Sequence, residues 1–220
     1  MEDTTIENAL KTFEGFYLKK DYANALKALE GHQKEIDLGL WHYNMGTVLA
    51  EMNNWPLARF HFILAEKSGF NNKQIHQNLL LVEDKLDITR LEKPLSTSDY
   101  LLKASFVAAD GPLVTLGFLI LAVGLYYLKK KPSLKSATIF IVAVFTPLML
   151  DLWIDAWPRK IVTSNKVIYE GPSALFGPLG ELPQGLMILS NKKDGWEEII
   201  YPSRFAGWIK PEDLKSLELK

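Results

Sequence analysis

Histidine is the side chain best suited to proton transfer near neutral pH, and all four histidines lie in the first 76 residues. His32, His42, His61 and His76 show neither the spacing of metal ligands nor a paired carboxylate. The sequence has no cysteine, which excludes disulfides, thiolate metal sites and cysteine nucleophiles. We therefore predict no catalytic residues, no cofactor, no metal site and no enzyme activity.

Two carboxylates, Asp151 and Asp155, interrupt the most apolar part of the chain. They are four residues apart, so a helix would place both on one side. They could form a polar contact with a partner helix or with a basic residue of another subunit. They could equally be an interfacial pair that reaches water, and the sequence leaves both readings open.

Two stretches near the N-terminus resemble each other at a spacing of about 33 residues, which is typical of stacked helical hairpins. Tyr22 aligns with Trp55 and Ala25 with Ala58. The second stretch, which contains YNMG and then Ala58, Phe62 and Ala65, resembles a tetratricopeptide repeat. A further helix at 73–86 is expected to cap the stack.

Stacks of this kind leave a concave face for a peptide or a helix. The resemblance implies that Tyr43, Asn44, Thr47 and Glu51 line this groove. The alternative is that these four residues have ordinary surface or packing roles.

After residue 158 the pattern changes to short extended runs separated by turns, with Asp194-Gly195 as a hairpin signal. About sixty residues of this kind predict a small β-barrel. The runs EGPS, DGWEEI and GWI resemble a bacterial SH3-like domain. A further set of residues could line an aromatic groove for a peptide or a cell-wall fragment, or form the barrel core: Tyr169, Trp196, Tyr201 and Trp208.

Between these regions, residues 106–128 and 137–157 are long apolar segments, each with aromatic residues near one end. Segments of this length favour two transmembrane helices over buried core helices. The loop at 129–136 contains Lys129, Lys130, Lys131 and Lys135, which indicates a cytoplasmic position. Both ends of the chain would then lie outside. Because the sequence opens MEDTTIENAL without a basic start or an apolar run, either a signal peptide has been removed or the orientation is reversed.

The expected fold class is thus a multidomain membrane protein with α-helical tetratricopeptide hairpins, two transmembrane helices and a C-terminal SH3-like β-barrel. The repeat domain would span 1–92, a junction 93–105, and the β domain 159–220. The formal net charge of −1 argues against a broad nucleic-acid-binding face.

This order of parts, with the stretch QNLLLVEDKLDITRLEKPLSTSDYL at the junction, resembles the BatE-like tetratricopeptide family of bacterial aerotolerance (Bat) operons. The resemblance implies a non-enzymatic membrane scaffold that works in envelope stress tolerance. Its partners would be von Willebrand factor A-domain membrane proteins and, indirectly, a MoxR-type AAA+ ATPase. The implied location is the bacterial inner membrane, with both folded domains in the periplasm. The alternative is a membrane protein that binds peptidoglycan through its SH3-like domain.

Overall fold

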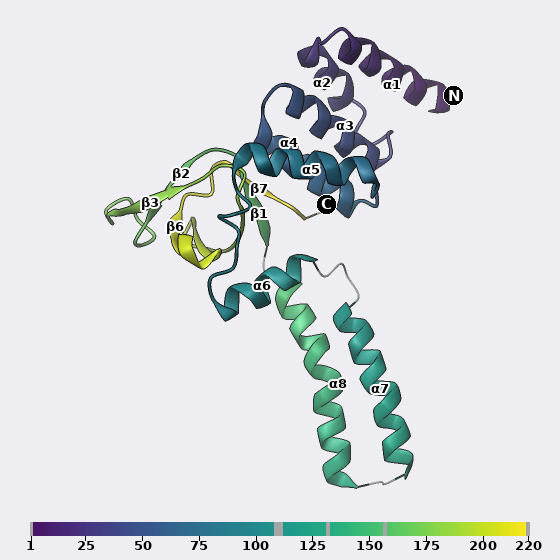
Figure 1. Cartoon of the computed structure of the whole chain (residues 1–220), viewed down its shortest axis with the longest axis vertical. Coiled ribbons are helices and arrows are strands. Elements are labelled where there is room, and N and C mark those ends of the chain that lie inside the picture. Colours follow the sequence, from purple (N-terminus) through teal and green to yellow (C-terminus); the bar gives the residue numbers. More distant parts are fainter. Residues whose placement is uncertain (1, 108–111, 131–132, 156–157, 219–220) are drawn as a thin grey trace. The chain divides into compact units, whose positions relative to one another are not determined.

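The computed structural model describes residues 2–107, 112–130, 133–155 and 158–218. They form two compact units (Figure 1). The first contains residues 1–93 and 159–220, and the second contains residues 94–158. The first unit therefore brings together the two ends of the sequence, and the second is inserted between them.

The helical part of the first unit consists of antiparallel hairpins that form a stack (Figure 1). Its helices are α1 (Glu2–Leu18), α2 (Tyr22–Glu30), α3 (Leu38–Glu51), α4 (Trp55–Lys67) and α5 (Lys73–Leu86). Asp21, Asp37 and Asn72 cap three of these helices by accepting a hydrogen bond from a backbone N–H of the first turn. The helix at 73–86 has the bounds that the sequence indicated.

The sheet part of the first unit is antiparallel and has seven strands within the described residues. The strand order is β3-β2-β6-β5-β4-β1-β7. The strands are β1 (Arg159–Val162), β2 (Lys166–Tyr169), β3 (Pro178–Leu182), β4 (Met187–Lys193), β5 (Trp196–Tyr201), β6 (Gly207–Ile209) and β7 (Leu214–Ser216), with a short 3-10 helix η1 (Ser203–Phe205) before β6.

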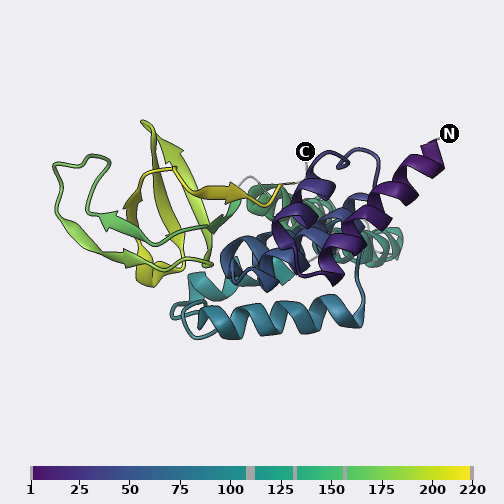
Figure 2. The same cartoon turned by 90° about the horizontal axis from the view of Figure 1, so that it is seen from above.

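The predicted small β-barrel is wrong, because the sheet is curled but open: its edge strands, β3 and β7, do not pair with each other in the described residues. The β2–β3 hairpin extends away from the other strands (Figure 2). The Asp194-Gly195 turn joins β4 to β5, with positive φ at both residues (52° and 80°), as expected for a two-residue hairpin loop.

A segment from outside the sheet fills the inside of its curl. Ile88, which follows α5, is fully buried in a core that otherwise consists of sheet residues such as Ile188 and Ile209. Leu86 and Leu91 pack against the same core. Burying an isoleucine side chain contributes about 2 kcal/mol. The chain that leaves α5 therefore completes the core that the open sheet lacks.

The second unit contains α6 (Thr97–Val107), α7 (Pro112–Lys130) and α8 (Leu134–Asp155). Helices α7 and α8 pack side by side, and a side chain at Gly124 would collide with the ring of Phe140. Asp99, at the start of α6, is buried and accepts a hydrogen bond from the backbone N–H of Leu95.

The membrane prediction is the main correction. Among the residues described, no helix has both the length and the apolar content that a bilayer crossing needs. The apolar part of α7 ends before Lys129, so it is about 26 Å long, against roughly 30 Å for a hydrocarbon core. In α8, Lys135 and Asp151 are only about 24 Å apart along the helix axis.

Several expectations fall with that finding. The transmembrane helices at 106–128 and 137–157, the cytoplasmic loop at 129–136 and the multi-pass inner-membrane location with periplasmic domains were all wrong. The membrane part of the expected fold class was wrong too, because no described helix is long and apolar enough to cross a bilayer.

Candidate partner-binding surface

The α3–α4 hairpin that carries the predicted groove depends on one close approach between its helices. A Cβ atom at Gly46 would lie 2.8 Å from the ring of Phe62, so only glycine fits there. Asn53, with a φ of 59°, makes the turn, and Pro56 stands in the first turn of α4. These residues fix α3 against α4 and so fix which face of α3 remains uncovered.

The four predicted groove residues follow one another along α3. Tyr43 is half-buried, with its ring 4.8 Å from that of Phe70. The Thr47 hydroxyl donates to the Tyr43 carbonyl at 2.9 Å. Asn44 is half-buried, and Glu51 is exposed at the end of the helix. The face therefore has a packed aromatic end and a charged, open end.

At the open end, side chains from three helices meet around Glu51. The Tyr22 hydroxyl donates to Glu51 Oε2 at 3.1 Å, and the Tyr17 and Tyr22 ring centroids are 5.8 Å apart. Partial burial and then the Glu51 carboxylate raise the pKa of Tyr17. The sequence did not identify either tyrosine as a site residue. The one available signal was the alignment of Tyr22 with Trp55, another aromatic residue, in the second repeat.

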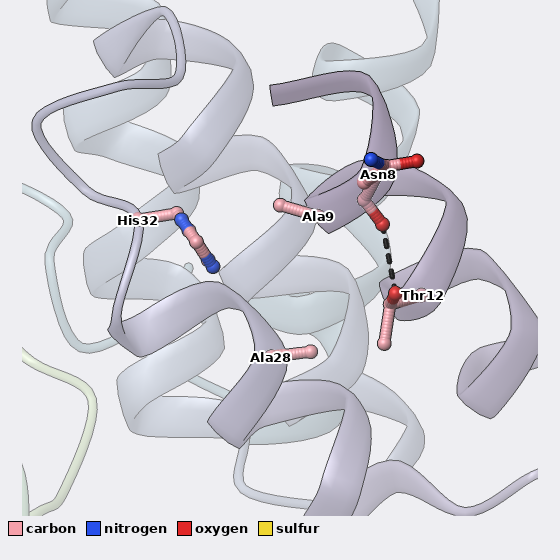
Figure 3. Close-up of a pocket in the computed structure, with 5 residues that line it drawn as sticks. All are labelled: Asn8, Ala9, Thr12, Ala28 and His32. Atoms are coloured by element: carbon pink, nitrogen blue, oxygen red, sulfur yellow. Dashed lines mark hydrogen bonds between the residues drawn. The ribbon is translucent and has the colours of Figure 1, made fainter. Parts of the chain in front are cut away.

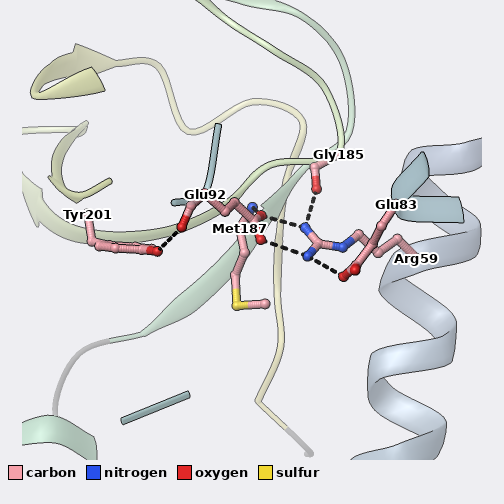
Figure 4. Close-up of polar contacts among 6 residues, drawn as sticks. All are labelled: Arg59, Glu83, Glu92, Gly185, Met187 and Tyr201. Atoms are coloured by element: carbon pink, nitrogen blue, oxygen red, sulfur yellow. Dashed lines mark hydrogen bonds and ion pairs between the residues drawn. The ribbon is translucent and has the colours of Figure 1, made fainter. Parts of the chain in front are cut away.

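A buried arginine joins the helices to the sheet (Figure 4). Arg59 on α4 is 2% exposed. Its guanidinium donates to Glu92 at 2.6 Å and 2.9 Å, to Glu83 at 2.8 Å and to the Gly185 carbonyl at 2.7 Å. Burial alone would lower the Arg59 pKa, but Glu92 and Glu83 raise it above its ordinary value. Arg59 is therefore a permanent cation held between two carboxylates.

Glu92 extends the same network into the sheet. Its side chain accepts from the backbone N–H of Met187 at 2.7 Å, and its carbonyl accepts from the Tyr201 hydroxyl at 2.8 Å (Figure 4). Leu86 packs against both the helical core and the sheet core. The short segment after α5 thus has polar and apolar contacts with both the helices and the sheet. We call residues 86–93, together with Arg59, the joint.

A second contact between helices and sheet is mostly apolar. Leu64 of α4, Ile161 of β1 and Leu217 form one buried cluster. The Lys67 ammonium donates to the Leu217 carbonyl at 3.1 Å. The Lys215 ammonium lies 5.5 Å from the centre of the Phe60 ring. Together with the joint, this contact makes helices and sheet one body.

The four aromatic residues proposed for a groove on the sheet do not share one environment. Tyr169 and Trp196 form an edge-to-face pair with ring centroids 5.6 Å apart, and both are half-buried. Trp208 is half-buried and lies opposite Tyr169 in the β2–β6 pairing. Tyr201 is 1% exposed and donates to the Glu92 carbonyl of the joint. The structure therefore brings three of them to one region and places Tyr201 in the interior.

His42 and His61 form a buried pair between α3 and α4, with their Nδ1 atoms 2.9 Å apart. Burial lowers the pKa of His42 to about 4. Burial, then His42 and Lys215, lower the pKa of His61 to about 3. Both rings are neutral at pH 7, where one donates and the other accepts. This arrangement packs the hairpin and offers no carboxylate partner for acid–base catalysis.

A hollow of about 310 Å³ lies between α1 and α2 and is lined by Asn8, Ala9, Thr12, Ala28 and His32 (Figure 3). The Thr12 hydroxyl donates to the Asn8 carbonyl at 2.7 Å, and His32 pairs with Glu35 at 2.6 Å. Its polar groups are thus engaged with near neighbours. Within the part of the chain that the structure describes, no group of histidines and carboxylates could hold a metal ion.

Asp151 and Asp155 lie on α8, but their side chains fall outside the described residues. Both readings of this pair stay predictions.

The residues that organise the joint were also missed from the sequence. One signal was available: Arg59 is the only Lys, Arg, Asp or Glu in the run WPLARFHFILA. A lone arginine in an apolar helix face indicates a buried ion pair. Comparisons of the chain with protein-family models, with curated proteins and with solved structures found no match.

Proposed function

We propose that this chain is a non-catalytic adaptor that holds partner proteins on a rigid body made of helical hairpins and a curled sheet. The observation that carries the proposal is the joint: a 2% exposed arginine that bonds two helical-side carboxylates and a sheet carbonyl. Removing one partner of such a buried ion pair is strongly destabilising, so the network ties the helices to the sheet in one arrangement.

Rigidity supports an adaptor role because binding surfaces on the two parts then keep a fixed relation. The helical part presents the α3 face, where Asn44 and Thr47 are half-buried and Glu51 is exposed. The sheet part presents the β2–β3 hairpin, where Leu175, Phe176 and Leu179 are exposed at 96%, 47% and 54%. Exposed apolar residues gathered on one hairpin favour a contact with another protein.

As partners we propose the proteins that the Bat resemblance implies, von Willebrand factor A-domain proteins with a MoxR-type ATPase acting through them. Their large folded domains suit a surface spread over several helices, and an adaptor needs no catalytic group. The buried histidine pair and the Arg59 network are both used internally, which is consistent with a non-catalytic role.

Co-purification tests this function. The full chain, tagged and expressed in its native host, should co-purify with a von Willebrand factor A-domain protein. The double variant Asn44→Ala/Thr47→Ala should reduce the recovered amount at least fivefold, while the exposed-loop control Lys34→Ala should leave it unchanged. Recovery of neither partner with the unaltered chain, or equal recovery with the double variant, would refute the proposal.

A further inference from the structure

Glu51 differs in its bonding partners from three other carboxylates of the first unit, each of which is paired with a cation. Glu92 is paired with Arg59, Glu197 with Lys160 and Asp213 with Lys166. Within the described residues, the Tyr22 hydroxyl donates to Glu51, and Glu51 also raises the pKa of Tyr17. A tyrosine hydroxyl is uncharged, so it holds the carboxylate in place without forming an ion pair with it.

The rings beside this carboxylate add to the same preference. Tyr17 and Tyr22 tilt toward each other at 58° with centroids 5.8 Å apart, and Phe13 lies 5.9 Å from Tyr17. Tyr17, Tyr22 and Phe13 are half-buried, so part of each ring surface is open to solvent. The face of an aromatic ring carries negative potential and attracts ammonium and guanidinium groups. The carboxylate and the rings therefore both favour a positively charged ligand.

We propose that Tyr17, Tyr22 and Glu51 form a recognition site for a cationic side chain, lysine or arginine, of a partner protein segment lying along α3. The site combines an ion pair to Glu51 with contacts to the tyrosine rings. The proposal rests on the adaptor function above and assigns the chemistry of its partner. Arginine suits this site best, because its planar guanidinium can stack on a ring while donating to a carboxylate.

The rest of the α3 face sets a second requirement on the partner. Tyr43 lies two turns before Glu51, about 12 Å along the helix, and packs with Phe70. Thr47 stands between them on the same side. An extended segment covers 12 Å in about four residues. A cationic residue followed or preceded, four positions away, by an apolar one would therefore reach both ends of the face.

A pair of peptides provides the probe. The first is the capped peptide Gly-Arg-Ser-Ala-Ser-Phe-Gly, and the second has citrulline in place of arginine, which removes the charge and keeps the shape. Binding to the full chain is followed by NMR of ring-labelled tyrosine. The arginine peptide should shift the Tyr17 and Tyr22 signals and bind at least tenfold more tightly than the citrulline peptide.

Protein variants complete the test. Glu51→Gln should weaken binding of the arginine peptide at least tenfold. Glu30→Gln, at an exposed carboxylate on α2, should leave that binding unchanged. Equal binding of the two peptides, or no loss with Glu51→Gln, would overturn the proposal. If von Willebrand partners are lost from Asn44→Ala/Thr47→Ala but retained by Glu51→Gln, the cation site fails and the adaptor function stands. If no partner co-purifies but the arginine peptide binds as stated, the adaptor function alone fails.

Discussion

Two carboxylates of the first unit, Glu92 in the joint and Glu51 on α3, are used in opposite ways. Glu92 is 12% exposed and accepts from Arg59 and from the Met187 backbone. Glu51 is exposed and accepts from the Tyr22 hydroxyl. The first charge is cancelled inside the protein and holds parts together, whereas the second remains free to attract a partner. Stability should therefore depend on the joint, and recognition on the open face.

The largest effect is expected where the buried charges lose their counterion. Arg59→Met removes the guanidinium that donates to Glu92, to Glu83 and to the Gly185 carbonyl. Breaking a buried pair in this way costs about 3–5 kcal/mol. Urea unfolding of the full chain should show this decrease in the free energy of unfolding of the first unit.

Two further variants define that measurement. Arg90→Met, at an exposed position of the same segment that carries Glu92, should change stability by no more than about 0.5 kcal/mol. The double variant Arg59→Met/Glu92→Gln should recover part of the loss, because no ionised partner at position 92 is left buried. A loss below about 1 kcal/mol for Arg59→Met would mean that the joint is not an energetic link.

The second effect is a pH dependence of stability that comes from the interior of the α3–α4 hairpin and not from the open face. The folded pKa values of His42 and His61, about 4 and 3, lie below the unfolded value of 6.5. As pH falls below 6.5, the unfolded chain takes up protons that the folded chain does not. Stability is therefore complete above about pH 6.5 and declines as the pH falls toward the folded values of about 4 and about 3, with a slope of up to about 1.4 kcal/mol per pH unit for each histidine.

Unfolding at pH 7 and at pH 5 measures this decline. Replacing the pair, as His42→Gln/His61→Leu, should remove most of the difference between the two pH values. The control Lys34→Ala, at an exposed loop position, should preserve it. If the unaltered chain is equally stable at both pH values, the histidine pair is not buried in the neutral form.

A smaller effect compares one substitution at two places. Tyr201→Phe removes the hydroxyl that donates to the Glu92 carbonyl in the joint, at a cost of about 1 kcal/mol. Tyr22→Phe removes the hydroxyl that donates to Glu51 on the open face, where water replaces it, so stability should change less than in Tyr201→Phe. Thermal unfolding of both variants checks the ranking, and the reverse order would contradict the division between joint and face.

The sequence predicted best what depends on near neighbours. The helix at 73–86 and the hairpin at Asp194-Gly195 both follow from local patterns, and both are present. The joint could not be predicted in the same way, because Arg59 and Gly185 are 126 residues apart in the sequence. For the same reason the sequence left Tyr201 open between a groove and the barrel core: the Glu92 carbonyl to which its hydroxyl donates lies 109 residues away.

The membrane prediction failed for another reason. Phe118, Ile139 and Phe145 are exposed apolar residues on α7 and α8, so the apolar character that prompted it is present in the structure. Hydropathy along the sequence measured that character but not where each helix begins and ends. The helix bounds decide whether a segment can span a bilayer, and here the described helices do not meet that requirement.

The smallest effect concerns the open face alone. After a contribution from burial, Glu51 raises the pKa of Tyr22 by accepting its hydrogen bond and by its charge. It raises the pKa of Tyr17 through its charge as well. Glu51→Gln removes the charge, so both tyrosines should ionise at lower pH, closer to 10.0, while the free energy of unfolding stays within about 0.5 kcal/mol of its original value. NMR titration of ring-labelled tyrosine measures the two pKa values, and Glu30→Gln serves as the matched control. Unchanged tyrosine pKa values would show that Glu51 does not direct its charge at this face, and a large loss of stability would make it a structural residue like Glu92.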